Sequence, residues 1–324
     1  MPEKNNDDAP VLLPTLGASL DQFVRSGGMP QREFTVKART QREIVFRRFL
    51  KHRAAVTSLI VFLLVVLFAF VGPLLWNQSF NFMSNDIEVP PSGTHPFGTD
   101  SNGYDLFADV MHGTARTLEI ALSVSIASTV IGTVYGAVSG YFRGWVDTVM
   151  MRIADLILTI PAIVVAIIVS DKLSASISSA WYFLAFILSA LFWPVCARIV
   201  RAQVLSLREK EFVEAARALG AKDTRIIFRH IVPNCLGSII VVLTLTVANT
   251  VLVETALSFL GFGVRPPDTS LGTLVSNGQT AIQDGFPWLF YFPALFIILI
   301  VLTINFIGDG LRDAFDPQQT RVRA

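Results

Sequence analysis

The chain contains 324 residues, of which 52% are hydrophobic and 16% are charged. This composition excludes an ordinary soluble domain and is typical of a membrane protein with several spans. The formal net charge of +1 points by itself to no class of partner, and we expect no binding to nucleic acid.

The chain begins with a polar segment, residues 1–53, which we expect to be a cytoplasmic tail that ends in a basic juxtamembrane region. From Gln31 to Arg53, Lys and Arg residues are interleaved with apolar residues. This pattern is typical of a topology signal that lies against anionic lipid headgroups, although a specific partner site is an alternative. We expect residues 54–317 to form the transmembrane domain and residues 318–324 a second cytoplasmic tail.

Six apolar stretches have the length of about 20 residues that crosses a hydrocarbon layer of roughly 30 Å. They are approximately Ala54–Leu75, Leu118–Gly140, Val149–Val169, Ile177–Ala197, Leu236–Phe259 and Leu289–Ile307. We therefore predict an all-α integral membrane fold with six transmembrane helices. Lys and Arg residues are retained in cytoplasmic loops, and an inside N-terminus places twenty-three of the 26 on that side. Both termini are thus predicted to be cytoplasmic.

Two outer loops follow from this topology, and both are rich in turn-forming residues. Residues 76–117 include a motif rich in Gly, Asn and Pro, which indicates turns, and Leu106–Met111 is predicted to be a short interfacial helix. Residues 261–287 also contain many Gly and Pro residues. Together the two loops are predicted to be the face that a soluble extracytoplasmic partner meets.

Acidic and histidine side chains in the first outer loop suggest a metal site as an alternative interpretation. The residues are His95, Asp100, Asp105, Asp109 and His112. Their spacing matches no compact ligand set, so we expect no metal in this chain.

A charged segment, residues 211–234, lies between the fourth and fifth predicted spans. Its first part is rich in good helix formers, and Gly220 is able to take the left-handed position that ends a helix. A second short helix is predicted to follow, capped by Asp223 or Thr224 and stopped by Pro233 before the next span. The segment is therefore predicted to be a helix-turn-helix on the cytoplasmic side.

Glu254 lies inside the fifth predicted span. A carboxylate at a helix centre costs about 2.5–3.5 kcal/mol on insertion scales, so it usually faces a bundle interior or an aqueous cavity. One hypothesis places Glu254, together with Asn249, on a translocation pathway. The alternative is a structural hydrogen bond near the outer rim. Pro161 and Pro194 are predicted to kink their spans.

Three motifs at separate places resemble one family. The outer-loop residues His95-Pro-Phe-Gly98-Thr99-Asp100, with Asp105-Leu-Phe after them, resemble a signature of the inner-membrane permeases for dipeptides, oligopeptides and nickel. The run Glu214-Ala-Ala, then Gly220, then Ile-Val-Pro233 is similar to the coupling loop of binding-protein-dependent ABC importer permeases. Leu257–Pro267 and Gly308–Pro317 resemble the last two spans of that family. This chain departs from the general pattern at His230, where Ile is usual, and at Leu271, where that branch often has Trp.

The resemblance implies a type I ABC importer permease that moves peptides. It would pair with a second related permease and two ATPase subunits in the lipid bilayer of the cytoplasmic membrane, and accept its cargo from an extracytoplasmic binding protein. Contacts to the ATPases are expected from Glu211, Glu214, Ala215, Ala216, Gly220, Asp223, His230 and Pro233. The small Ala215 and Ala216 would let the helix approach a partner closely, and Glu214 could form a charge-assisted bond there.

No stretch matches the phosphate-binding pattern of Gly, four residues and Gly-Lys-Ser/Thr. This chain is therefore not expected to be an enzyme or to hold a cofactor, and ATP and Mg²⁺ would be bound by the partner subunits. Nickel chelates or glutathione-like compounds are alternative cargoes. A proton-coupled secondary carrier using Glu254 and Asp155 would need no ATPase, but we see no inverted repeats. A membrane-embedded enzyme would need converging catalytic groups, and none is apparent.

Overall fold

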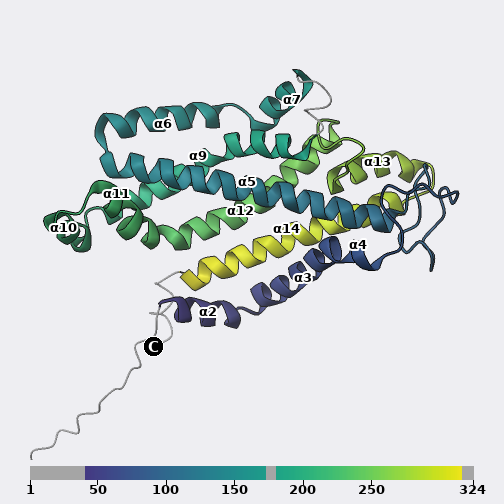
Figure 1. Cartoon of the computed structure of the whole chain (residues 1–324), viewed down its shortest axis with the longest axis horizontal. Coiled ribbons are helices and arrows are strands. Elements are labelled where there is room, and N and C mark those ends of the chain that lie inside the picture. The colour runs from purple at the N-terminus through teal and green to yellow at the C-terminus, as the bar shows by residue number, and fades with distance from the viewer. Residues whose placement is uncertain (1–40, 173–179, 316–324) are drawn as a thin grey trace, which may run out of the picture. The chain divides into compact units, whose positions relative to one another are not determined.

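The computed structural model describes residues 41–172 and 180–315, which belong to one compact unit (Figure 1). Three parts of the predictions lie outside these residues: residues 1–40 of the predicted tail 1–53, the predicted tail 318–324, and the start of the predicted fourth span at Ile177. Residues 41–51 of the predicted N-terminal tail form a helix. Within them the regular elements are helices, accompanied by two isolated β-bridges, Met83 with Tyr104 and Thr99 with Asp105. The predicted all-α fold class is therefore confirmed.

The helices of the described part follow one another in this order: α2 (Gln41–Lys51), α3 (Arg53–Phe70), α4 (Gly72–Leu75), α5 (Leu106–Phe142), α6 (Gly144–Thr159), α7 (Ala162–Lys172), α9 (Trp181–Leu207), α10 (Glu211–Ala218), α11 (Asp223–Arg225), the π-helical η1 (Ile226–Ile231), α12 (Val232–Phe259), α13 (Leu271–Gln283) and α14 (Trp288–Phe315). Five continuous helices in this part are long and apolar enough to cross a membrane. The bent pair α6 and α7 makes a sixth span if it is counted as one.

The third predicted span is broken at Pro161. The axes of α6 and α7 differ by 76° across a short break, and Ile160 has an extended backbone with φ −89° and ψ 126°. A proline disfavours the α-region for the residue before it and has no N–H to donate. The predicted kink is thus a full interruption at Pro161, whereas α9 continues through Pro194.

Helix α5 begins earlier than predicted. Asp105 caps its N-terminus by accepting a hydrogen bond from the Ala108 N–H at 3.2 Å, and the helix then runs without interruption to Phe142. The predicted separate interfacial helix at Leu106–Met111 is therefore wrong, because these residues are the first turns of α5. Gly113 lies within this helix. It lies where α5 closely approaches the backbone of Ser270.

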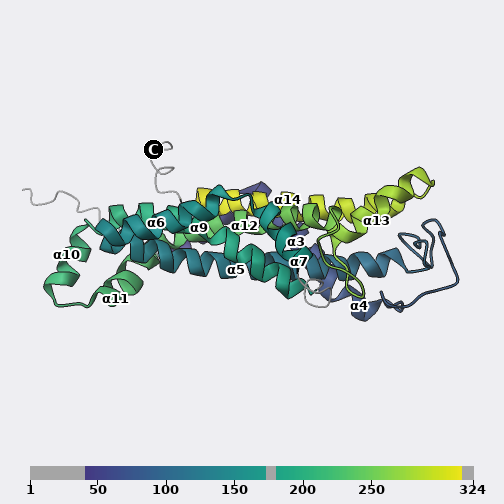
Figure 2. The same ribbon diagram turned by 90° about the horizontal axis from the view of Figure 1, so that it is seen from above.

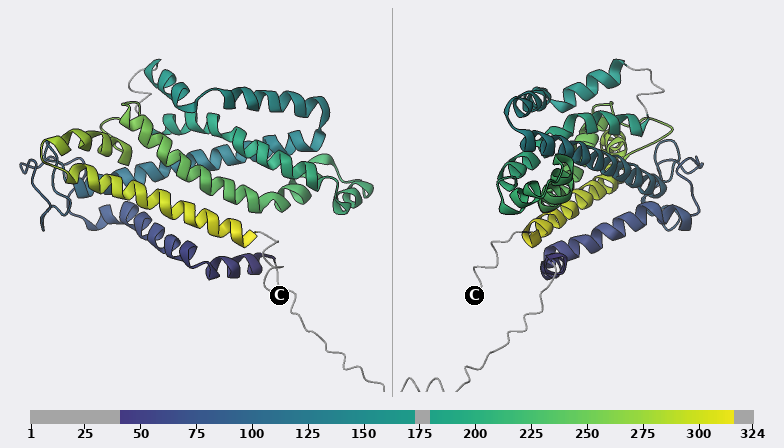
Figure 3. Two further views of the ribbon diagram at one scale, coloured as in Figure 1. Left: turned by 180° about the vertical axis from the view of Figure 1, so that it is seen from behind. Right: turned by 60° about the vertical axis from the view of Figure 1, so that its left-hand side comes forward.

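Glycines at four-residue intervals hold α5 against α9. A Cβ atom added to Gly132 would lie 2.6 Å from the Cβ of Cys196, and one added to Gly136 would lie 2.2 Å from the Ala197 carbonyl oxygen. A Cβ on Gly140 would lie 2.9 Å from the Arg201 carbonyl oxygen. Small residues on one helix face let two backbones approach closely within a membrane. On the other side of the bundle, α3 and α14 lie side by side (Figure 3).

The two predicted functional ends of the chain lie apart. Helices α10 and α11 lie at one end of the long helices, and residues 76–105 with α13 lie at the opposite end (Figures 1 and 2). Helix α13 lies in a stretch that we expected to be a loop. Ser270 starts this helix by accepting a hydrogen bond from the Thr273 N–H at 3.3 Å. The separation agrees with the predicted topology, in which the charged loop and the outer loops face opposite compartments.

Candidate functional site

Helix α10 presents one face to the protein and the other to solvent. Val213 and Ala216 are three residues apart and therefore share a face, and both are buried in an apolar cluster with residues of α5, α9 and η1. Glu211, Glu214 and Ala215 are exposed. Of the two alanines predicted to approach a partner, only Ala215 faces outward. Ala216 packs against its own chain.

The end of α10 has the backbone conformation that was predicted. Gly220 has a φ of 76°, and its N–H donates to the Arg217 carbonyl oxygen at 2.9 Å. The Ala221 N–H donates to the Ala216 carbonyl oxygen at 3.1 Å. These two bonds form a Schellman motif, which needs a left-handed residue at the first position after the helix cap. The turn at Gly220 is confirmed, and its role in coupling stays a prediction.

The predicted second short helix is wrong, because α11, η1 and α12 form one continuous helix from Asp223 to Phe259. Lys222 precedes the first turn, and no side-chain hydrogen bond caps it. Pro233 does not end the helix. A proline within a helix clashes with the carbonyl four residues earlier, and here the preceding turns are π-helical, which is the wider form found within helices at functional positions.

Tyr141, near the end of α5, fastens this loop to the bundle. Its hydroxyl donates to Asp223 Oδ1 at 2.6 Å, so Asp223 holds the loop instead of capping a helix. Arg208 donates to the Tyr141 carbonyl oxygen. The guanidinium carbons of Arg208 and Arg217 lie 5.8 and 6.0 Å from the Tyr141 ring centroid, within the range of cation–π attraction. Sequence reasoning missed Tyr141, because its partners are far from it in the chain.

The outward surface of the loop combines apolar and acidic side chains. Leu219 is 88% exposed, Phe228 is 48% exposed and Phe212 is 40% exposed, and the exposed Glu211 and Glu214 lie beside Phe212 in the chain. We call these five residues the α10 face. Phe212 lies on α10, whereas Leu219 and Phe228 follow it in the chain, and exposed apolar side chains next to polar ones are typical of protein or membrane interaction sites. His230 is half-buried, and its carbonyl oxygen accepts a hydrogen bond from the Asn234 amide at 2.6 Å.

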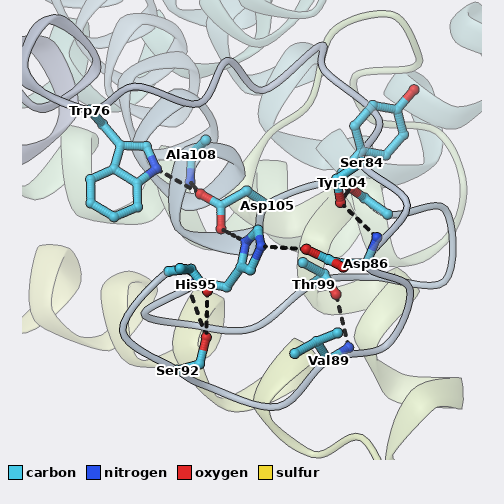
Figure 4. Close-up of polar contacts among 12 residues, drawn as sticks. Trp76, Ser84, Asp86, Val89, Ser92, His95, Thr99, Tyr104, Asp105 and Ala108 are labelled. Atoms are coloured by element: carbon cyan, nitrogen blue, oxygen red, sulfur yellow. Dashed lines mark hydrogen bonds and ion pairs between the residues drawn. The ribbon is translucent and has the colours of Figure 1, made fainter.

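At the opposite end, the outer-loop motif folds around a buried His–Asp pair (Figure 4). His95 Nδ1 lies 3.0 Å from Asp105 Oδ1, and His95 Nε2 lies 3.4 Å from Asp86 Oδ2. Trp76 Nε1 donates to Asp105 Oδ2 at 2.8 Å. Since Asp105 also caps α5, a single carboxylate connects the loop to the first turn of that helix.

The remaining motif residues shape the same loop. Gly98 has a φ of 81°, and a Cβ atom there would lie 2.6 Å from the Val89 carbonyl oxygen. Thr99 Oγ1 accepts a hydrogen bond from the Val89 N–H at 2.9 Å. Asp100 Oδ1 accepts hydrogen bonds from the backbone, one of them from the Tyr104 N–H at 2.8 Å. The motif side chains thus bond to each other and to the nearby backbone.

The two residues predicted for a pathway have different surroundings. Glu254 is fully buried, and its Oε1 accepts hydrogen bonds from Ser258 Oγ at 2.7 Å and Ser270 Oγ at 2.6 Å. This is the arrangement that the structural alternative describes. Asn249 is exposed and lines a cavity of about 400 Å³ beside Pro161 and the break between α6 and α7. Their pathway role stays a prediction.

Comparisons with known proteins agree with one another. The family model for "Binding-protein-dependent transport system inner membrane component" matches residues 132–321, and the model for "N-terminal TM domain of oligopeptide transport permease C" matches residues 40–91. The oligopeptide transport system permease protein OppC of Mycobacterium tuberculosis is 42% identical over 285 residues, which cover 88% of this chain and 97% of that protein. A putative peptide permease protein of Brucella suis biovar 1 is 42% identical over 277 residues, 84% of this chain and 89% of the relative.

A solved transporter structure shares the fold. The inward-facing MetNI methionine ABC transporter superposes with a TM-score of 0.51 at 20% sequence identity, over 65% of this chain and 98% of that chain.

Proposed function

This chain belongs to the family of binding-protein-dependent transport system inner membrane components, and on that premise we propose that it is the permease subunit of an ATP-driven peptide importer. The observation that supports this proposal most strongly is the α10 face, which exposes apolar and acidic side chains at one end of the helices. A second related permease, two ATPase subunits that bind ATP and Mg²⁺, and an extracytoplasmic binding protein complete the proposed transporter.

The contacts of α10 supply a path for coupling. Movement of α10 by an ATPase subunit would act on α5 through the contact of Arg217 with the Tyr141 ring and through the buried Val213. It would also act on the continuous helix that begins at Asp223 and contains Asn249. The cavity beside Asn249 and Pro161 would then change shape as the ATPases close. A rigid helix carries such a movement better than the hinge that two separate helices would provide.

The cargo proposed is a peptide, because the relatives that match most of this chain are named as peptide permeases. Nickel chelates and glutathione-like compounds are the alternatives within the same transporter type. A proton-coupled carrier is disfavoured at Asp155, which pairs with Arg198. Such a carrier would also need no ATPase subunits.

Uptake by the reconstituted complex tests the function. Proteoliposomes that contain this chain with its partner permease, ATPases and binding protein should accumulate a radiolabelled pentapeptide when ATP is enclosed. Complexes whose ATPase subunits cannot hydrolyse ATP should show no uptake, and a protonophore should leave uptake unchanged. Uptake that persists without ATP hydrolysis and collapses with the protonophore would instead establish a secondary carrier.

A further inference from the structure

An acidic cavity lies at the end of the bundle opposite α10. Its volume is about 390 Å³, within the range of small-ligand sites, roughly 300–1,000 Å³. Its walls are formed by residues of the first outer loop, by the first turns of α5, by α13 and by residues around the start of α14. Its carboxylates are Glu88, Asp100, Asp109 and Asp284. The described residues that line this cavity include no Lys, Arg or His, so the lining contributes four carboxyl groups and no basic group.

Asp109 distinguishes this cavity from a cluster of solvated acids. Asp109 is only 9% exposed, and its carboxyl group has no hydrogen-bond or ion-pair partner among the described residues. Asp100, in contrast, accepts hydrogen bonds from the backbone of Asn102 and Tyr104. The position of Asp109 in the first turn of α5 favours a negative charge, because the N-terminus of a helix is electropositive. A buried charge without a partner is nevertheless unfavourable, so a cation in the cavity would stabilise it.

The lining of the cavity fits an organic cation better than a metal ion. No group of three or more His, Cys, Asp or Glu side chains within residues 41–172 and 180–315 is placed to hold a metal ion. The rest of the lining supplies polar groups from Asn277 and Thr280 and an apolar wall. Leu106, Leu274, Phe286 and Leu289 form that wall. Such a lining suits a charged nitrogen group on an aliphatic stem, since each part meets a matching surface.

We propose that this cavity binds an ammonium or guanidinium group carried on an aliphatic stem, with Asp109 as its buried anionic partner. The group could come from a Lys or Arg side chain of the extracytoplasmic binding protein or from a free organic cation. Assigning the source rests on the proposed function, whereas the existence of the site does not.

Direct binding tests the site independently of transport. L-Argininamide is titrated into the transporter complex in lipid nanodiscs, and binding is measured by isothermal titration calorimetry. We expect saturable binding that Asp109→Asn weakens about tenfold or more, because Asn keeps an acceptor oxygen but loses the negative charge that pairs with the cation. L-Citrullinamide has the same stem and α-amino group but lacks the guanidinium charge, and it should bind more weakly. Absence of saturable binding, equal binding of the two amides, or full binding by Asp109→Asn would overturn the proposal.

Two further variants separate loss of the site from loss of the fold. Thr280 is exposed at the cavity wall, so Thr280→Lys should place an ammonium group near Asp109 and block argininamide while every carboxylate remains. Asp171→Asn makes the same change of charge at an exposed residue of α7 outside the cavity and should leave binding unchanged. Argininamide binding that survives in Thr280→Lys, or falls in Asp171→Asn, would contradict the assignment.

Competition then identifies the source of the cation. If saturating argininamide weakens docking of the binding protein to the nanodiscs, the native group is a basic side chain of that protein. If docking is unaffected while argininamide still requires Asp109, the native ligand is a free organic cation. Displacement of argininamide by Ca²⁺ or Mg²⁺ at stoichiometric concentration would overturn the proposal in favour of a metal site. Pentapeptide uptake, measured separately, reports on the proposed function alone.

Discussion

Gly220 ends α10 in a conformation that other residues adopt at a cost. Its φ is 76°, and a Cβ atom added there would meet no other atom within 4 Å. Space around the residue is therefore sufficient for a side chain, and only the left-handed backbone favours glycine. This separates the conformational requirement from packing, so a substitution at Gly220 tests the conformation alone.

Gly220→Leu should lower stability and uncouple transport. A non-glycine residue in the left-handed region costs roughly 1–2 kcal/mol, and the strain would be relieved by turning α10 away from its position. Thermal unfolding and the ratio of peptide uptake to ATP hydrolysis measure the two effects. Gly144→Leu is the matched control, because Gly144 has a φ of 59° with open space around it. Normal coupling in Gly220→Leu, or equal uncoupling in both variants, would count against the role of this turn.

Substitutions at Glu254 distinguish a structural role from a role in the translocation pathway. Because its Oε1 accepts from two serine hydroxyls, Glu254→Gln keeps an acceptor oxygen and should transport acidic, neutral and basic peptides at the normal rate. Glu254→Leu removes the acceptor and should lower the free energy of unfolding by about 1–3 kcal/mol. Thermal unfolding and uptake of the three peptide classes provide the readout. Selective loss of basic peptides in Glu254→Gln would show that this carboxylate meets the cargo.

Helix α10 is positioned by its neighbours more than by its own length. A helix of eight residues is marginal in isolation, and Val213 and Ala216 bury one side of it against α5, α9 and η1. The Tyr141 hydroxyl adds a charge-assisted hydrogen bond to Asp223 across the loop. The attachment of α10 is thus a property of several elements together.

Tyr141→Phe should loosen this attachment. Loss of the bond to Asp223 is expected to cost about 1 kcal/mol or more and to make residues 208–225 more susceptible to limited proteolysis. Tyr135→Phe is the control, since the Tyr135 hydroxyl donates to the Met150 carbonyl oxygen at 2.8 Å, away from this loop. We expect lower uptake per ATP hydrolysed only in Tyr141→Phe. Equal proteolysis of residues 208–225 in both variants would refute a specific role.

The segment before α13 is tied to α5 by an ionic cluster. Asp268 Oδ1 lies 2.7 Å from His112 Nε2, and Arg116 Nε lies 2.7 Å from Asp268 Oδ2. Partial burial acts to raise the pKa of Asp268, but the hydrogen bonds and charges of His112 and Arg116 outweigh it, and the pKa of Asp268 lies below its ordinary value. The ionised carboxylate is therefore the form that the fold stabilises.

The stability that this cluster contributes should consequently be lost in acid. A lowered carboxyl pKa contributes stability that is complete above the unfolded value, about 3.9, and is lost as the pH falls through the lowered folded value. Melting temperatures of the wild type and Asp268→Asn should thus differ at pH 7 and converge as the pH falls below 3.9. A difference that stays constant over this range would show that the charge of Asp268 is not responsible.

At the scale of the whole molecule, the two surfaces proposed to meet partners lie at opposite ends of the long helices (Figure 1). The outer loop is built around His95 and Asp105, and the latter also caps α5. Helix α5 then runs to Tyr141, which holds the α10 loop. One helix thus connects the site proposed for the extracytoplasmic partner with the site proposed for the ATPases.

A substitution in the outer loop should therefore change ATP hydrolysis by the subunits at the opposite end. His95→Ala removes the buried partner of Asp105 and should reduce the stimulation of ATP hydrolysis by the binding protein, while hydrolysis without that protein stays unchanged. Thr94→Ala, at the exposed neighbouring position, should have no effect. ATPase assays on complexes in nanodiscs with and without binding protein measure both values. Full stimulation in His95→Ala would show that the outer loop does not take part in this communication.

Much of the architecture could be predicted from sequence, because hydropathy and charge act over short stretches of chain. Apolar length indicated the spans, and the helical nature of the fold is confirmed in the described residues. The boundaries were less predictable. Helix α5 starts at Leu106 because Asp105 caps it, and α13 forms in a stretch whose Gly and Pro residues indicated a loop. Local pattern does not reveal which cap or tertiary contact will extend a helix.

The sequence by itself determined that the chain is an all-helical membrane protein, and Gly220 indicated the left-handed turn, because both depend on local properties of residues. Only the tertiary structure decided that Pro233 lies within a continuous helix, that Ala216 faces inward and that Tyr141 holds Asp223. Only the tertiary structure shows that Asp109 is buried and unpaired in an acidic cavity. These features depend on which helices pack together, since burial and pairing join residues that are distant in the chain.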